Sequence, residues 1–207
     1  MILRGLTAPL RGLYAITPEA ADTEVLLRQV SAALEGGIAL LQYRRKQHAG
    51  PQEAATLAAL CRRSGVPFIV NDDIELALAC GADGVHLGRD DGTLATARSK
   101  LGGKLLGASC YNSLDAARAA AAAGADYIAF GSVFPSSTKP SAVQAPHALF
   151  GEARPLGVPM VAIGGITLEN APQLLAAGAD AIAVISDLFD APDIAARARA
   201  YGKLFAR

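Results

Sequence analysis

Short apolar runs alternate with longer segments of helical periodicity along this chain. Each apolar run has the length and the scarcity of charge that are typical of a buried strand. Eight runs are expected to form strands, at residues 13–17, 38–44, 67–72, 84–88, 105–110, 127–134, 158–165 and 181–186. Apolar residues with helical spacing predict helices at about residues 22–35, 51–65, 74–80, 94–101, 113–123, 146–154, 168–177 and 193–205. The chain is therefore a series of strand–helix units.

The alternation predicts the fold class. Strands that are apolar nearly throughout are typical of a parallel sheet covered on both faces. Eight strand–helix units in a chain of 207 residues fit a closed barrel better than an open, doubly wound sheet. We therefore predict an α/β protein in which residues 1–207 form a single (β/α)8 (TIM) barrel domain.

A tripeptide, Gly-Ala-Asp, recurs at three places between a helix and the following strand. A glycine that ends a helix in the left-handed conformation, followed by entry into the strand, explains the repeat. The three aspartates then fall at the N-terminal ends of the strands, away from the expected active site, and we interpret them as structural: Asp83, Asp126 and Asp180.

Composition narrows the classes of partner and compartment. The formal net charge of zero gives no electrostatic reason to expect nucleic acid or a membrane surface. The segment Met1–Thr7 lacks the pattern of an export signal, and no apolar window approaches ~18 residues. Cys61, Cys80 and Cys110 are widely spaced without a C-x-x-C motif, which argues against a disulfide framework or a zinc site. We expect a cytoplasmic protein without a membrane span.

Polar residues gather where the predicted strands end, which is where barrels of this kind carry their active sites. After the second strand, Gln42, Arg44 and Lys46 share one parity and would all face the barrel mouth. Together with Lys139 from the loop after the sixth strand, they would form a pocket for a highly charged anion. The alternative interpretation is a solvated basic run on a flexible loop.

Pairs of aspartates follow the third and fourth strands: Asp72 with Asp73, and Asp90 with Asp91. Mg²⁺ typically takes one or two carboxylates and completes its shell with water and phosphate oxygens, so these strand ends predict a magnesium–diphosphate site. An N-cap at the first pair and a turn at the second explain the same residues equally well. The pattern alone leaves both interpretations open.

A second anion site is expected farther around the barrel. The hydroxyls and the lysine of Ser136–Lys139 suit a phosphate, although a polar surface loop has the same composition. Barrels commonly hold phosphate after strands seven and eight, where this chain has Gly164, Gly165 and Ser186. A tight turn is the alternative explanation of the two glycines.

Histidine and nucleophile patterns carry less information. His86 shares the parity of Gly84 and Gly88 and would point inward, but a lone histidine in a strand is more often a core residue with satisfied hydrogen bonds. His48 and His147 are expected in loops. Because no serine or cysteine shows a pattern of pairing with His and Asp, we do not expect covalent catalysis.

Several ordered motifs, spread over nearly the whole chain, resemble the thiamine-phosphate synthase family. They are Leu13–Thr17, Gln42–Lys46, Asn71–Asp73, Gly84–Gly88, Gly107–Tyr111, Phe130–Pro140, Ala162–Ile166 and Val184–Ser186. The family joins 4-amino-2-methyl-5-hydroxymethylpyrimidine diphosphate to 4-methyl-5-hydroxyethylthiazole phosphate, or to its carboxylated form, and releases diphosphate. The resemblance implies a transferase of thiamine biosynthesis that acts on these small molecules and requires Mg²⁺.

The resemblance also implies roles for particular residues. Gln42 would contact the pyrimidine, and Asp72 and Asp91 would bind Mg²⁺. The diphosphate would be held by Arg44, Lys46, Asn71, Ser109 and Lys139, of which Arg44, Lys46, Ser109 and Lys139 would act in catalysis. The thiazole phosphate would lie against Ser136, Thr138, Gly165, Ile185 and Ser186. The reaction would proceed by ionisation of the pyrimidine C–O bond, followed by attack of the thiazole nitrogen.

Two other functions remain open from the sequence. A thiazole tautomerase is a related barrel that isomerises the thiazole and lacks the metal carboxylates, and a non-catalytic sensor would bind thiamine intermediates without turnover. The chain departs from the family at Ser136, where threonine is common, at Tyr43, where leucine is frequent, and at Tyr111, where histidine is often found. These departures concern substrate tolerance. A homo-oligomer is compatible with this sequence.

Overall fold

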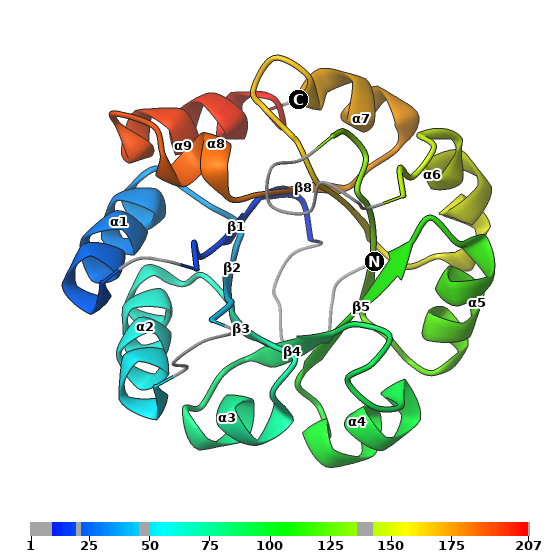
Figure 1. Ribbon diagram of the computed structural model, residues 1–207, viewed down its shortest axis with the longest axis horizontal. Coiled ribbons are helices and arrows are strands. Elements are labelled where there is room, and N and C mark those ends of the chain that lie inside the picture. Colours follow the sequence, from blue (N-terminus) through cyan, green and yellow to red (C-terminus); the bar gives the residue numbers. More distant parts are fainter. Residues whose placement is uncertain (1–9, 20–21, 46–49, 136–142, 207) are drawn as a thin grey trace.

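The computed structural model describes residues 10–19, 22–45, 50–135 and 143–206. Its strands form a closed, all-parallel barrel in sequence order, in which β1 pairs with β2 on one side and with β8 on the other. Figure 1 shows this ring of strands in the centre of the molecule. The strands are Gly12–Ile16 (β1), Leu40–Tyr43 (β2), Phe68–Asn71 (β3), Gly84–Leu87 (β4), Leu105–Tyr111 (β5), Tyr127–Phe130 (β6), Met160–Ile163 (β7) and Ala181–Val184 (β8). The predicted barrel is confirmed.

Helices surround the barrel on the outside (Figure 1). They are Thr23–Glu35 (α1), Pro51–Ser64 (α2), Ile74–Ala79 (α3), Leu94–Leu101 (α4), Leu114–Ala122 (α5), Ala148–Ala153 (α6), Ala171–Ala177 (α7), Ser186–Phe189 (α8) and Ile194–Lys203 (α9), with a 3-10 turn at Arg154–Leu156 (η1). Asp22 caps α1 through its side chain, as one of two candidates for this position.

Most boundaries differ from the prediction by one or two residues, and three differences stand out. The sixth strand ends at Phe130, although the apolar run continues to position 134, and the segment that follows bonds to the end of β7 through Val133 N and to the loop after it through Phe134 N. The seventh helix begins at Ala171, after a turn in which Thr167 N donates to the Asn170 side chain. Ser186 begins the short helix α8, which is separate from the last helix α9.

Alternation along the strands divides the core into two layers. Residues that face outward pack beneath the helices in one large buried cluster. Residues that face inward fill the barrel itself, among them Tyr14, Leu40, Ile69, Tyr127 and Val161. Because side chains fill the interior, the barrel is a packed core rather than a channel, and ligands are restricted to its ends.

The three Gly-Ala-Asp aspartates have the structural role that the sequence predicted. The carboxylate of Asp83 accepts the backbone N–H of Phe68, and those of Asp126 and Asp180 accept the N–H groups of Leu106 and Met160. Their glycines all have positive φ, which permits the left-handed end of the preceding helix. Each aspartate therefore ties the start of its own strand to the start of the preceding one.

The cysteines and the lengths of the helices also bear on the expectations from the sequence. The three cysteines are free and buried, as expected for a chain without disulfides. Among the described residues, no helix is both long and apolar enough to cross a membrane.

Candidate active site

A cavity of about 940 Å³ opens at the C-terminal ends of the strands. Its wall includes side chains or backbone from all eight strands or from the loops that follow them. Of the site residues predicted from the sequence, those that line it are Gln42, Arg44, Asn71, Ser109, Gly165, Ile185 and Ser186. The barrel therefore brings together residues that lie more than a hundred positions apart in the chain.

Four predicted site residues fall on segments outside the described part of the chain: Lys46, Ser136, Thr138 and Lys139. Their roles stay predictions. Pro135, the last described residue before three of them, lines the cavity.

Strand β2 presents its polar residues alternately to the cavity and to the helices. Gln42 is buried and lines the cavity, and so does Arg44, two residues farther on. Arg45 points the other way, toward the buried carboxylate of Glu53 on α2, with 3.1 Å between its Nε and Glu53 Oε1. Arg45 Nη2 also donates to Glu53 Oε2 at 3.3 Å. The predicted inward parity of Gln42 and Arg44 is confirmed.

Arg44 is held in place by residues after β1. Its guanidinium lies 3.0 Å from the Glu19 carboxylate, and its backbone N–H donates to the Thr17 hydroxyl at 2.9 Å. The Arg44 side chain is only 16% exposed. An arginine fixed in this manner at the cavity wall is suited to a phosphate, because its orientation is set before the ligand binds.

The aspartates after β3 and β4 have different surroundings. Asp73 is the N-cap of α3 and accepts the N–H of Leu76, so the N-cap interpretation applies to Asp73. Asp72 has a φ of 64°, and its N–H donates to His86 O on β4. Asp91 accepts the N–H of Gly88 at 2.7 Å.

Asp72 and Asp91 are thus attached to the two residues that flank Leu87 on β4. Both are half-buried, and neither belongs to the cavity wall among the described residues, whereas Asp90 does. No group of three or more potential metal ligands occurs in the described part of the chain. Two carboxylates at adjacent strand ends fit a Mg²⁺ ion that takes its remaining ligands from water and diphosphate.

His86 lies at the floor of the cavity and pairs with a serine. Its Nε2 lies 2.9 Å from Ser109 Oγ, and its Nδ1 lies 3.2 Å from the Tyr127 hydroxyl. No local sequence pattern indicated this serine–histidine pair, because the register of β4 with β5 produces it. Because the other ring nitrogen faces a phenol rather than a carboxylate, the arrangement is not a catalytic triad. Burial lowers the pKa of His86 to about 4, against an opposing effect of the Asp91 charge.

The loops after β6 and β7 lie against each other at the opposite side of the cavity. Gly164 and Gly165 both have positive φ, and a Cβ on either would collide with Ser132 or with the Phe134–Pro135 backbone. Only glycine fits at both positions. The two glycines therefore allow residues 132–135 to pack against the loop after β7.

A cation that the sequence did not indicate lies near Ser186. Arg197 of α9 lines the cavity, and its Nη1 forms an ion pair with both carboxylate oxygens of Asp187, at 3.0 and 3.1 Å. The Tyr201 hydroxyl donates to the same carboxylate at 2.7 Å. Arg197 thus offsets the negative charge of Asp187 at this end of the cavity. No sequence pattern indicated a role for Arg197, because only the packing of the last helix brings it to the site.

A second unpredicted feature lies at the rim between β4 and β5. The Arg89 guanidinium stacks over the ring of Tyr111 at 4.8 Å, and Arg89 N donates to the Tyr111 hydroxyl. Tyr111 has a φ of 53°, uncommon for an aromatic residue. Both side chains line the cavity, so Tyr111 and Arg89 together form its wall on this side.

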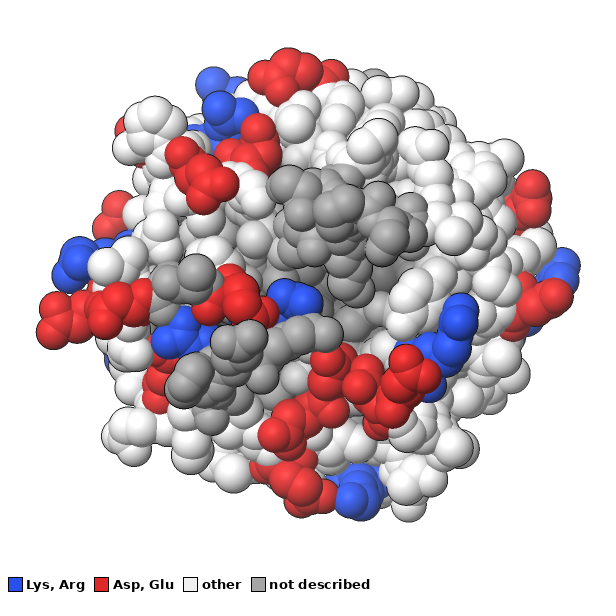
Figure 2. All heavy atoms as spheres, viewed as in Figure 1, with Lys and Arg blue, Asp and Glu red and all other residues white. Residues whose placement is uncertain are grey.

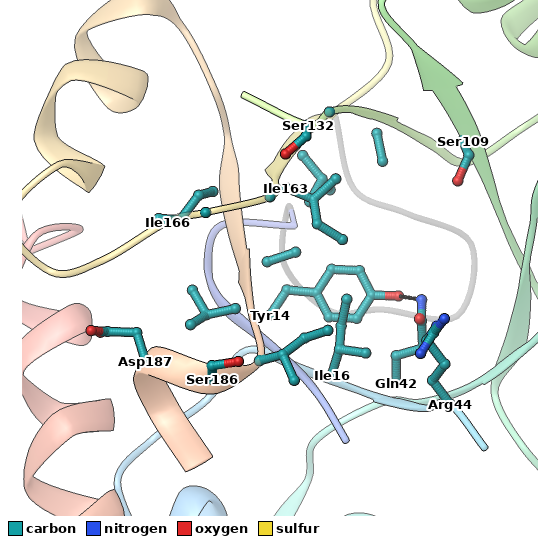
Figure 3. A pocket seen from close by; sticks show the side chains of 18 of the residues that line it. Tyr14, Ile16, Gln42, Arg44, Ser109, Ser132, Ile163, Ile166, Ser186 and Asp187 are labelled. Atoms are coloured by element: carbon teal, nitrogen blue, oxygen red, sulfur yellow. Dashed lines mark hydrogen bonds between the residues drawn. The ribbon is translucent and has the colours of Figure 1, made fainter. Parts of the chain in front are cut away.

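The cavity has two polar ends with an apolar surface between them. Figure 3 shows Gln42, Arg44 and Ser109 at one side, Ser186 and Asp187 at the other, and Ile16 and Ile163 between. In the space-filling view, acidic and basic side chains stand close together around the central hollow (Figure 2). Such a cavity suits two anionic molecules whose organic parts meet in the middle.

Comparison with known proteins identifies the family of this chain. The family model described as thiamine monophosphate synthase matches residues 13–188. A thiamine-phosphate synthase of Aromatoleum aromaticum is 61% identical over 201 residues, which cover 95% of this chain and 97% of that protein. The chain belongs to the thiamine-phosphate synthase family.

Other members of the thiamine-phosphate synthase family are also similar to this chain. A relative with that name in Methylobacillus flagellatus is 57% identical over 201 residues, covering 95% of this chain and 96% of its own. The solved structure of a thiamine phosphate pyrophosphorylase from Pyrococcus furiosus superposes with a TM-score of 0.83 at 36% identity, over 93% of this chain and 94% of that one. The resemblance inferred from the motifs is confirmed, and with it membership in a family of transferases.

Proposed function

We propose that this protein joins 4-amino-2-methyl-5-hydroxymethylpyrimidine diphosphate to 4-methyl-5-hydroxyethylthiazole phosphate, or to its carboxylated form, to give thiamine phosphate and diphosphate. The observation that carries the proposal is the cavity with two polar ends and an apolar surface between them. One end suits a diphosphate and the other a monophosphate, and the two rings react between them. Family membership supports this choice of substrates.

The diphosphate end would be formed by residues after β2, β3 and β5. Arg44 is preoriented by Glu19 and supplies a fixed charge, while Asn71 and Ser109 line the same part of the cavity. Lys46 and Lys139 complete the set in this proposal. Gln42, next to Arg44 on the inner face of β2, would contact the pyrimidine.

Asp72 and Asp91 would hold Mg²⁺ at the edge of the diphosphate end. Their oxygens are the hard ligands that this cation prefers, and two carboxylates leave coordination positions for diphosphate oxygens. When bound, the ion would offset the negative charge that builds up on the departing diphosphate.

The thiazole phosphate would lie at the opposite end of the cavity. Gly165, Ile185 and Ser186 line this end, and Ser136 and Thr138 follow Pro135 at its edge. Arg197 contributes a positive charge here that the family motifs did not indicate.

The described residues fit a mechanism in which the pyrimidine C–O bond breaks before the new C–N bond forms. Such a reaction requires no protein nucleophile, in agreement with His86 facing Tyr127 and Ser109 rather than a carboxylate. Fixed donors around the leaving group supply the stabilisation, and one well-placed donor contributes about 3 to 4 kcal/mol. Ile16 and Ile163 form an apolar surface that would shield the cationic pyrimidine from water.

The alternatives fit less well. A thiazole isomerase has no use for paired carboxylates and a fixed arginine at a diphosphate end, and a sensor has no need for a cavity large enough for both substrates. The named relatives that match over nearly the whole chain are synthases.

The proposal is tested by incubating the purified protein with both phosphorylated substrates, with and without Mg²⁺. We expect thiamine phosphate only in the presence of the metal. Asp91→Asn is expected to lower turnover at least a hundredfold, that is by about 3 kcal/mol, with little change in thiazole-phosphate binding. Asparagine keeps an oxygen for the Gly88 N–H, so the loop is preserved while the charge is lost.

Asp73→Asn is the matched control, because it removes the same charge from an exposed residue outside the described cavity wall, and asparagine keeps an oxygen for the Leu76 N–H. Equal losses in the two variants would contradict the metal assignment. Bound ligand without turnover would favour the sensor, and interconversion of thiazole isomers would favour the tautomerase.

A further inference from the structure

Five side chains form a continuous hydrogen-bonded network beneath the cavity, from β2 across the barrel to β5. Gln42 Nε2 and the Tyr127 hydroxyl each lie 2.7 Å from the Tyr14 hydroxyl. The Tyr127 hydroxyl lies 3.2 Å from His86 Nδ1, and His86 Nε2 lies 2.9 Å from Ser109 Oγ. We call these five residues the barrel network. It connects the residue proposed to contact the pyrimidine with one proposed to hold the diphosphate.

The three middle residues are buried, although Tyr14 and His86 also line the cavity. Tyr14 is 1% exposed, Tyr127 is fully buried and His86 is 7% exposed. The ring of Tyr127 also packs edge-on to Tyr14 and parallel to His86, with centroid distances of 5.9 and 5.5 Å. Buried hydroxyls need a hydrogen-bond partner, and both phenols find one within the network. Burial raises the pKa of Tyr14 and of Tyr127, so both phenols keep their protons.

With the Gln42 amide nitrogen on the Tyr14 hydroxyl, one direction of the hydrogen bonds lets every buried hydroxyl of the network both accept and donate. Tyr14 then accepts from Gln42 and donates its own O–H to Tyr127. Tyr127 then donates to His86 Nδ1. A neutral imidazole with an accepting Nδ1 carries its hydrogen on Nε2, from which it donates to Ser109 Oγ.

We propose, on the basis of the function proposed above, that the barrel network orients its two ends for the reaction, with Tyr14, Tyr127 and His86 as positioning residues. Ser109 Oγ accepts from His86 and is left to donate its own hydrogen into the cavity. Gln42 uses its amide nitrogen on Tyr14 and presents its oxygen to the cavity. One end is therefore a fixed donor and the other a fixed acceptor.

These two polarities match the two groups of the pyrimidine substrate. A phosphate oxygen accepts a hydrogen bond, which a serine hydroxyl of this orientation provides. An exocyclic amino group donates, and an amide oxygen accepts from it. As the pyrimidine becomes cationic its amino group gains positive charge, so the hydrogen bond to Gln42 strengthens during the reaction. With the opposite direction, an amide N–H₂ would face this amino group and repel it.

The tautomer of His86 reports the direction of the whole network. The chain has three histidines, so nitrogen-15 labelling of histidine gives a simple spectrum, and a His86→Gln variant assigns the signals of interest. At neutral pH we expect a neutral ring with hydrogen on Nε2. Hydrogen on Nδ1, or a cationic ring, would overturn the proposal. This measurement uses the unmodified protein and is independent of whether it has synthase activity.

Tyr127→Phe interrupts the network at its centre without altering the cavity. Among the described residues, Tyr127 is not part of the cavity wall, and phenylalanine keeps both ring contacts. We expect turnover per KM for the pyrimidine diphosphate to fall at least tenfold, because the donor and the acceptor lose their fixed directions. The KM for thiazole phosphate should remain within about twofold, since that ligand binds at the other end. The His86 signal should become a mixture of tautomers.

Tyr43→Phe is the matched control. Tyr43 is also buried, and its hydroxyl donates to Glu53 at 2.7 Å on the outer side of β2, away from the cavity. This variant is expected to keep the parental His86 tautomer and the parental KM for the pyrimidine diphosphate. An equal effect of the two substitutions, or an unchanged tautomer and KM in folded Tyr127→Phe, would show that Tyr127 serves only packing. If Tyr127→Phe does not fold, the His86 tautomer in the unmodified protein still tests the proposed direction of the network.

Discussion

At the scale of single residues, two adjacent arginines show how strand parity separates function from stability. Arg44 and Arg45 are the same residue type with the same charge, and only their positions along the strand distinguish them. Arg44 lines the cavity, whereas Arg45 is 12% exposed and pairs with Glu53, which is 7% exposed. Glu53 also accepts from the hydroxyls of Thr23 and Tyr43, so a buried polar cluster forms behind β2.

Arg45→Ala is expected to lower the free energy of unfolding by about 3 kcal/mol, because Glu53 would keep a buried charge without its cation. Arg44→Ala removes a cation whose partner, Glu19, is 35% exposed, and is expected to cost less than about 1 kcal/mol while reducing turnover strongly. Urea unfolding of both variants beside the parent measures these values. Similar losses of stability in the two would contradict the separation of roles.

At the scale of elements, the Gly-Ala-Asp connections explain how neighbouring strands are kept in register. Each aspartate lies before an even-numbered strand and accepts an N–H at the start of the preceding strand. Asp126 and Asp180 also bind an arginine, Arg98 at 2.9 Å and Arg154 at 3.1 Å. These contacts lie at the end of the barrel opposite to the cavity, which separates the elements that stabilise the fold from those that carry the chemistry.

Asp126→Ala is expected to lower the free energy of unfolding by about 3 kcal/mol, since it leaves the buried Leu106 N–H without its acceptor and removes the carboxylate that pairs with Arg98. Asp180→Ala should cost less, because its ion pair is more exposed, at 28% for Asp180 against 7% for Asp126. Chemical unfolding measures both. KM values for both substrates should be unchanged in the folded variants, and a change would show that these aspartates influence the cavity.

At the scale of the whole molecule, closure of the barrel creates the site. The pairing of β1 with β8 brings Ile16, on the first strand, next to Ile185 and Ser186, which follow the last. Without closure, the two polar ends of the cavity would belong to opposite edges of an open sheet. Ligands that bind at the mouth therefore stabilise the barrel as a unit.

Mg²⁺ together with inorganic diphosphate is expected to raise the midpoint of thermal unfolding. At a hundredfold excess over Kd the stabilisation is about 2.7 kcal/mol, which corresponds to roughly 5 to 10 °C for a chain of this size. Either component alone should have a smaller effect, and Asp91→Asn should lose the part that depends on Mg²⁺. An unchanged midpoint with both components present at high concentration would contradict a diphosphate site at this end of the barrel.

The sequence predicted the parts of the structure that depend on local periodicity. The apolar runs specify strands, and the fixed alternation along β2 specifies that Gln42 and Arg44 share the inner face. It also identified the Gly-Ala-Asp aspartates as structural, because a helix end and a strand start leave few other roles for them. The barrel rule indicated that the strand ends carry the chemistry, and the family resemblance added the roles of particular residues there.

Other features were decided by tertiary structure alone. The Ser109–His86–Tyr127 contacts depend on the register of β4 with β5 and of β5 with β6, and the Arg197–Asp187 pair depends on how α9 packs beside α8. These partners lie on different elements, and no local pattern encodes the distance between them. The sequence thus determined the barrel and the identity of its polar residues. Closure and strand register decided which of those residues meet, because hydrogen bonds across the barrel form only after the strands are assembled.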